Sequence, residues 1–229
     1  IEGVRHSSDI DSLLTFLTFR LFYPELRPAP LAESRRDAPV RLYLGVRLGG
    51  ALLTDESAFP SLDARRDTGA IGFNWLYGVA VGANFGRYLG AEVAFEGHEV
   101  QLAIPGLGSI GEYALYTIMP QARLRYPLLG GRLQPYALAG VGVSVAEFND
   151  GKPRSANLRI DAKDLVPAGA VGAGIEYFVT SNIAVNFEAK YNVVRGHVVR
   201  IEGFPAERGA LDSVYLGFGL RIFLAQFGG

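Results

Sequence analysis

The sequence predicts an all-β protein: an eight-stranded antiparallel transmembrane up-and-down β-barrel, preceded by a short N-terminal amphipathic helix. Three observations support this prediction. Between Val40 and Leu224, large apolar residues alternate with glycine, alanine or charged residues. The glycines and the charges share one side of each segment, which is typical of a narrow barrel with an apolar wall facing lipid and a small, polar interior. The connections between segments also alternate between short and long.

The alternation is clearest from Ile71 onward. Odd positions 71 to 81 carry isoleucine, phenylalanine, tryptophan, tyrosine and two valines, whereas the even positions carry mostly glycine, alanine and asparagine. Successive side chains of a strand leave opposite faces, so a period of two indicates a strand. In a water-soluble sandwich the small and charged residues would face solvent, and glycine would be scarce on that face.

Eight strands fit this pattern, at about 40–53, 70–84, 88–100, 112–127, 133–148, 166–179, 183–195 and 211–224. Short connections fall at 85–87, 128–132 and 180–182, and longer ones at 54–69, 101–111, 149–165 and 196–210. Short periplasmic turns and long outer loops are typical of outer-membrane barrels. We therefore expect a bacterial outer-membrane protein of the Gram-negative envelope, with both termini in the periplasm.

The stretch from Gly69 to Gly86 offers a competing interpretation, because it is free of charge and close to the length of a membrane-spanning helix. Gly72, Gly78 and Gly82, however, all fall on the side predicted to face the lumen. The other apolar segments are interrupted after ten to sixteen residues, which suits a tilted strand. The strand interpretation is favoured.

Aromatic residues gather near the predicted strand ends. An amphipathic ring is stable at headgroup depth, so these residues predict a girdle at each membrane interface. The residues expected at the periplasmic interface are Tyr43, Phe85, Tyr88, Tyr126, Tyr177 and Phe223.

Residues 1–39 predict a separate periplasmic segment, an amphipathic helix followed by a Pro-rich linker, and residues 40–229 the barrel domain. Ser8 and Asp11 resemble a capping box that opens the helix, and Pro24 ends it. An apolar stripe of this kind needs a partner surface, either the membrane interface or another envelope protein. We expect this segment to bind such a partner through Ile10, Leu13, Leu14, Phe16, Leu17 and Leu21.

Charged residues on the lumen side form the main candidate site. Because of the alternation, these side chains share one confined space. There each charge must pair with an opposite charge, or it is buried without the compensation that water would give. The favoured hypothesis is a salt-bridged plug, and the alternative is a charged conduit for small ions. The residues are Arg47, Glu92, Glu96, Arg123, Arg125, Glu176, Glu188, Lys190 and Arg221.

Catalytic, metal and cofactor sites are not expected. His98 and His197 are interpreted as plain polar residues at strand ends, and the chain carries no hydrolase, metalloprotease or nucleotide-binding motif. A formal net charge of -1 shows no excess of basic residues, which argues against nucleic acid as a partner. The absence of cysteine fits an oxidising compartment.

Residues 88–93, 119–127, 134–142, 174–178 and 215–223 resemble the OmpA-type superfamily of eight-stranded outer-membrane barrel domains. The last of these segments is similar to the C-terminal signal read by the barrel-assembly machinery. The resemblance covers about residues 40 to 224 and implies the fold, while the superfamily hosts adhesins, anchors, small channels and a few lipid-modifying enzymes. An N-terminal helix is not part of the usual pattern; the lipid A palmitoyltransferase barrel has one, but its catalytic residues have no counterpart identified in this chain.

The sequence therefore favours a non-enzymatic outer-membrane barrel that acts as a structural element, or as an anchor that docks a partner through its N-terminal segment. The expected partners are outer-membrane lipid and an envelope protein. A small ion or solute channel is the second hypothesis, and a lipid-modifying enzyme of the outer leaflet is the third.

Overall fold

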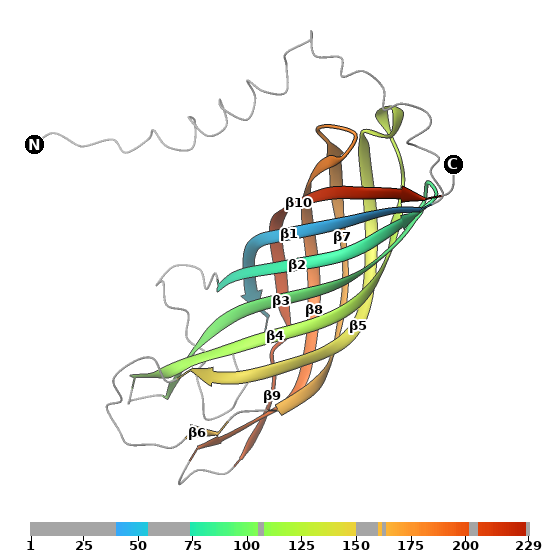
Figure 1. Cartoon of the computed structure of the whole chain (residues 1–229). Helices are drawn as coiled ribbons and strands as arrows, with labels where there is room; N and C mark the ends of the chain where they lie inside the picture. Colours follow the sequence, from blue (N-terminus) through green and yellow to red (C-terminus); the bar gives the residue numbers. More distant parts are fainter. Residues whose placement is uncertain are drawn as a thin grey trace, which may run out of the picture. The chain divides into compact units, whose positions relative to one another are not determined.

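The computed structural model describes residues 40–54, 74–104, 108–149, 160–161, 164–201 and 206–227, which form a closed antiparallel β-barrel (Figure 1). Neighbouring strands pair in chain order, and β10 pairs with both β1 and β8, which closes the cylinder. The eight barrel strands are β1 (Val40–Leu53), β2 (Asn74–Phe85), β3 (Leu89–Ile104), β4 (Gly108–Arg125), β5 (Leu133–Asn149), β7 (Asp164–Phe178), β8 (Ile183–Ile201) and β10 (Ser213–Phe227). The predicted fold class is confirmed for this part of the chain.

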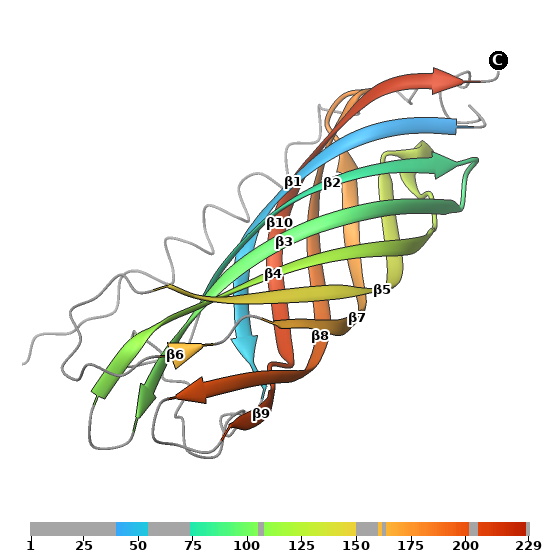
Figure 2. The same ribbon diagram turned by 60° about the horizontal axis from the view of Figure 1, so that its bottom comes forward.

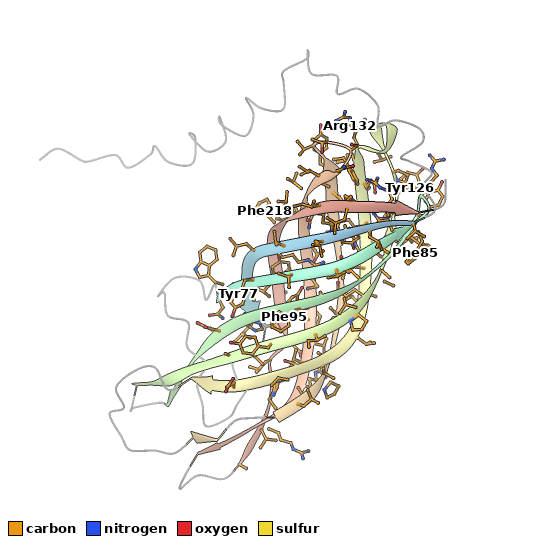
Figure 3. The ribbon with its side chains drawn as sticks, viewed as in Figure 1. Tyr77, Phe85, Phe95, Tyr126, Arg132 and Phe218 are labelled. Atoms are coloured by element: carbon orange, nitrogen blue, oxygen red, sulfur yellow. The ribbon has the colours of Figure 1, made fainter. Side chains whose placement is uncertain are left out.

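Side chains alternate between the lumen and the outer wall along each strand. In β1, Tyr43 and Arg47 are buried, whereas Leu44, Val46 and Leu48 are about half exposed. Nearly all of the exposed large hydrophobic side chains lie on the outer wall, and Figure 3 labels several aromatic ones there. A continuous apolar wall around a polar interior is the arrangement that a barrel needs in lipid, because lipid cannot hydrogen-bond to polar groups.

Both ends of the barrel sequence meet at the same end of the cylinder, where Val40 of β1 pairs with Phe227 of β10 and with Phe85 of β2. The three short connections, 86–88, 126–132 and 179–182, lie at this end, which we call the short-turn end (Figure 2). The 3-10 helix η1 (Leu129–Gly131) is part of the second connection.

At the opposite end two strand pairs run further than predicted. β3 and β4 stay paired as far as Ile104 and Gly108, although 101–111 was expected to be a loop. β8 extends to Ile201 and pairs with the short strands β6 (Ile160–Asp161) and β9 (Glu207–Ala210), inside segments also predicted as loops. Outside lipid a strand needs no apolar face, so the alternation that marks strands in the sequence disappears while backbone pairing continues.

The predicted aromatic girdle at the short-turn end needs correction at two positions. Phe85, Tyr88, Tyr126 and Tyr177 lie on the outer wall, but Tyr43 and Phe223 are almost fully buried in the lumen. There they pack on each other with ring centroids 5.3 Å apart. Both share the odd numbering of Arg47 and Arg221 on their strands, so strict alternation places them inside.

The predicted N-terminal helix and linker, residues 1–39, lie outside the described residues. Among the residues that the structure does describe, no helix is long and apolar enough to cross a membrane.

Candidate functional site

All nine lumen charges named from the sequence are buried in the barrel interior, each with 5% or less of its surface exposed. They come from β1, β3, β4, β7, β8 and β10, so six of the strands contribute. Eight of the nine form one connected group, which we call the lumen charge cluster: Arg47, Glu92, Glu96, Arg123, Glu176, Glu188, Lys190 and Arg221.

Glycines on neighbouring strands make room for these long side chains. Arg47 lies between Gly78 of β2 and Gly219 of β10, and Glu188 lies between Gly174 of β7 and Gly217 of β10. Because glycine leaves the adjacent surface empty, a long side chain can fold across the lumen without overpacking. The recurring glycines of the sequence therefore shape the space in which the charges meet.

Arg47 contacts three of the four carboxylates of the cluster. It donates hydrogen bonds to Glu92 and to Glu96, the latter at 2.9 Å from Nη1 to Oε1, and its Nη2 lies 3.9 Å from Glu188 Oε2. Glu92 and Glu96 are four residues apart on β3, so they point into the lumen side by side. Arg47 therefore joins β1 to β3 and β8 through charge.

Arg221 makes the corresponding contacts from β10. Its Nη1 lies 2.5 Å from Glu176 Oε2, and its Nη2 lies 3.5 Å from Glu92 and 3.9 Å from Glu188. Arg123 of β4 adds a second cation beside Glu176, at 3.7 Å. The two arginines that close the barrel from β1 and β10 share Glu92 and Glu188.

Lys190 completes the cluster from β8. It pairs with Glu96 and lies 4.0 Å from Glu188. Four carboxylates thus meet four cations, so the formal charges of the cluster cancel. Such pairing offsets the large cost of removing each charge from water.

Arg125, the ninth predicted residue, belongs to a different environment. Its guanidinium donates to Gln134 Oε1 at 2.9 Å and to the carbonyl oxygens of Gly86 and Leu89 at 2.9 and 3.0 Å. These contacts tie the 86–88 turn to β4 and β5 at the short-turn end. The structure therefore places Arg125 at the short-turn end of the barrel, outside the lumen charge cluster.

Three lumen tyrosines extend the cluster, and none of them was among the lumen residues named from the sequence. Tyr43 donates to Glu92 at 2.6 Å and Tyr136 donates to Glu188 at 2.8 Å, while Tyr215 lies under Lys190 at 5.2 Å. The guanidinium of Arg123 stacks on the ring of Tyr136 at 3.9 Å. The alternation that places the charges inside also places these rings inside.

Each tyrosine ring lies over a glycine of an adjacent strand. Tyr136 pairs with Gly174 across the β5–β7 interface, and a Cβ atom at Gly174 would come within 2.5 Å of the ring. Tyr43 pairs with Gly82 in the same manner. A glycine therefore provides the close approach that lets an aromatic ring cover bare backbone.

His98 and His197, expected as polar residues at strand ends, are both buried. Gly196, at a positive φ of 100°, lies at a register shift between Arg195 and His197, so Arg195 is exposed while His197 turns inward. Within the described ranges no group of three or more histidine, aspartate or glutamate side chains could hold a metal ion.

The fold and its interior define an integral outer-membrane barrel. Residues 29–224 match the family model of the outer membrane protein beta-barrel domain, and the chain belongs to this family.

Several solved structures are similar to this chain. Neisserial surface protein A is similar with a TM-score of 0.51 and 14% identity, over 81% of this chain and 97% of that one. The outer membrane protein OprG from Pseudomonas aeruginosa has a TM-score of 0.49 and 16% identity, over 82% of this chain and 98% of that one. The N-terminal barrel domain of Pseudomonas aeruginosa OprF has a TM-score of 0.41 and 14% identity, over 80% of this chain and 97% of that one. A comparison with curated proteins finds no match.

Proposed function

We propose that this protein is a non-enzymatic structural element and anchor of the outer membrane, with a lumen closed by the charge cluster. The observation that carries the proposal is the position of Arg47 and Arg221. Each guanidinium contacts three carboxylates drawn from at least two other strands, and both are 5% or less exposed. Cations held in this way link strands across the lumen.

A channel would need charges that face water and exchange partners with a passing ion. Here the tyrosine hydroxyls of Tyr43 and Tyr136 occupy further carboxylate oxygens, and aromatic rings stack on the cations. An eight-stranded barrel has an interior just wide enough for side chains to fill. The paired charges therefore favour a plug over a conduit.

Planar-bilayer recording tests this closure. The purified protein should show no stable unitary conductance of porin size. A variant with Arg47→Ser and Arg221→Ser, which removes the two bridging cations, should admit water and ions and so raise the conductance. Stable, large openings from the unaltered protein would establish the channel alternative. The control is Arg195→Ser, because Arg195 is exposed and lies outside the lumen charge cluster.

We further propose that the N-terminal segment docks an envelope protein, with the barrel as its anchor and with both termini in the periplasm. β1 begins and β10 ends at the short-turn end, and short turns are typical of the periplasmic side. The apolar positions Leu13, Leu17 and Leu21 provide the proposed contact surface. The polar positions of the predicted N-terminal helix carry too little positive charge for strong electrostatic adsorption to a membrane.

Deletion of residues 1–30 should leave a folded barrel and abolish co-purification of the partner in mild detergent. Substitution of Leu13, Leu17 and Leu21 by serine should have the same effect, whereas alanine at Ser12, Thr15 and Thr18 should not. If every co-purifying protein remained after the deletion, the segment would instead lie on the membrane surface.

A further inference from the structure

The short-turn end of the barrel holds a cavity of about 140 Å³, separate from the lumen charge cluster. Its walls come from the start of β1, the end of β2, the 86–88 turn and the connection between β4 and β5. About 10–15 Å³ of such space is enough for a water molecule, so a small polyatomic ion fits. The lining residues are Arg41, Asn84, Gly86, Arg87, Arg125, Pro127, Gly130, Gly131 and Gln134.

The described residues that line this cavity carry charge of one sign. Three arginines line it, and none of the described lining residues is acidic. Arg125 donates only to neutral acceptors in the contacts described above. Three guanidiniums held in one partly enclosed space raise the local positive potential, which attracts an anion.

Two of the three arginines, Arg41 and Arg125, are held in place before any ligand binds. Arg41 donates to the carbonyl oxygen of Ser181 at 2.6 Å, and its guanidinium lies 4.3 Å from the centre of the Phe223 ring. Arg125 is fixed by Gln134, which in turn donates to the carbonyl oxygen of Gly131 at 2.9 Å. Fixed donors lose little conformational freedom on binding, which favours affinity.

Asn84 provides a second, independent indication of a ligand. It lies opposite Arg41 in the β1–β2 register and is only 1% exposed, yet neither its Nδ2 nor its Oδ1 has a hydrogen-bond partner in the structure. A buried amide left in this state costs free energy, and such groups are rare unless they serve a ligand or an ordered water. Asn84 lines the cavity, so a bound oxyanion would satisfy its donor.

We propose that this cavity is a binding site for a phosphate group. Arg41, Arg87 and Arg125 line the cavity from β1, the 86–88 turn and β4, and several guanidiniums around one space suit a tetrahedral oxyanion with several acceptor oxygens. The outward aromatic residues Phe85 and Tyr126 lie at this same end (Figure 3). They place the site at headgroup depth, where a phosphate reaches it either from a lipid headgroup or as a free ion.

Calorimetric titration of the purified full-length barrel, in a maltoside detergent that contains no phosphate, tests the site. Inorganic phosphate and dihexanoyl phosphatidic acid are the two probes. At least one should bind with a stoichiometry of one per barrel. Comparable affinities identify a free phosphate as the ligand, whereas about tenfold tighter binding of the short-chain lipid identifies a headgroup, because the acyl chains add apolar contact.

Arg87→Gln and Arg41→Gln should each weaken binding about tenfold, since each removes a charge-assisted hydrogen bond. Arg87 is exposed, so its variant should keep the fold. Asn84→Ala removes no charge and should also weaken binding. The matched control is Arg132→Gln, an arginine at the same end that does not line the cavity and donates to Phe178 (Figure 3).

Three results would overturn the proposal. The first is that neither probe binds the unaltered protein. The second is that Arg132→Gln weakens binding as much as Arg87→Gln does. The third is that Asn84→Ala leaves the affinity unchanged, because the binding would then be general attraction to a positive surface.

Discussion

Arg47 offers the sharpest test of the lumen charge cluster, because it contacts three carboxylates and is only 5% exposed. The change Arg47→Met keeps most of the apolar stem and removes the charge. The cluster then holds four carboxylates and three cations, so one buried negative charge has no compensation. Breaking a buried pair from one side costs about 3–5 kcal/mol, and we expect unfolding free energy to fall by that amount.

The structure also sets a limit on this loss. Glu92 keeps its hydrogen bond from Tyr43 and its contact with Arg221 at 3.5 Å, and Glu96 keeps Lys190. A second change, Glu92→Gln, restores neutrality in the Arg47→Met background. The double variant should therefore be destabilised by less than the sum of the single variants, with a coupling of about 2–3 kcal/mol.

Urea-induced unfolding in lipid vesicles provides the measurement. Trp75 is the single tryptophan of the chain and is 66% exposed on the outer wall, so its emission reports insertion into lipid. Arg195→Ala is the control, because the Arg195 side chain is 70% exposed and its partner Asp212 keeps a hydrogen bond from the Val194 backbone N–H. Strict additivity of Arg47→Met and Glu92→Gln would refute the idea of a coupled network.

Three further predictions concern the wall and its ends. Val141→Arg places a charge at a mid-strand position that is 74% exposed to lipid, and unfolding free energy should fall by about 2–4 kcal/mol in vesicles, with Val141→Thr as a milder control. Gly174→Ala brings a Cβ within 2.5 Å of the Phe187 carbonyl oxygen and of the Tyr136 ring. The same assay should therefore show a loss of about 1–3 kcal/mol in unfolding free energy. An unchanged unfolding free energy would show that the strands can move apart. Gly196→Ala forces a positive φ on alanine at a register shift with open space around it, so limited proteolysis should cut the β8–β9 extension faster while the barrel remains folded.

The sequence predicts the barrel well because one physical constraint acts on every strand. Lipid requires an apolar outer wall, and a narrow lumen requires small or paired residues, so the side of each residue follows from its position. β1 was predicted with its observed bounds, Val40 to Leu53. The same alternation brings Arg47 and Arg221 into one interior, although which carboxylate each one contacts depends on strand tilt and register, which no local pattern encodes.

The errors arise where that constraint is weak or was applied loosely. Tyr43 and Phe223 were assigned to the outer wall because they are aromatic and near strand ends, although their numbering places them inside. The long β3–β4 pair extends beyond the region where lipid imposes alternation. Arg125 shares the lumen side with Arg123, but its distance along the barrel axis brings it to the turns, where backbone carbonyls are its partners.

The seam between β1 and β10 has a consequence for how the molecule assembles. It joins Val40 to Phe227, so the strands that close the cylinder are the first and the last of the described barrel. Contacts between such distant parts of a chain form late, because the entropy of loop closure must be overcome first. Until they form, the edges of β1 and β10 are open to pairing with other chains. Arg47 and Arg221 lie on these same two strands, and Glu92 and Glu188 contact both of them, so these two carboxylates gain both cations only when the seam closes. Closure of the cylinder therefore also completes the electrostatic compensation of its interior.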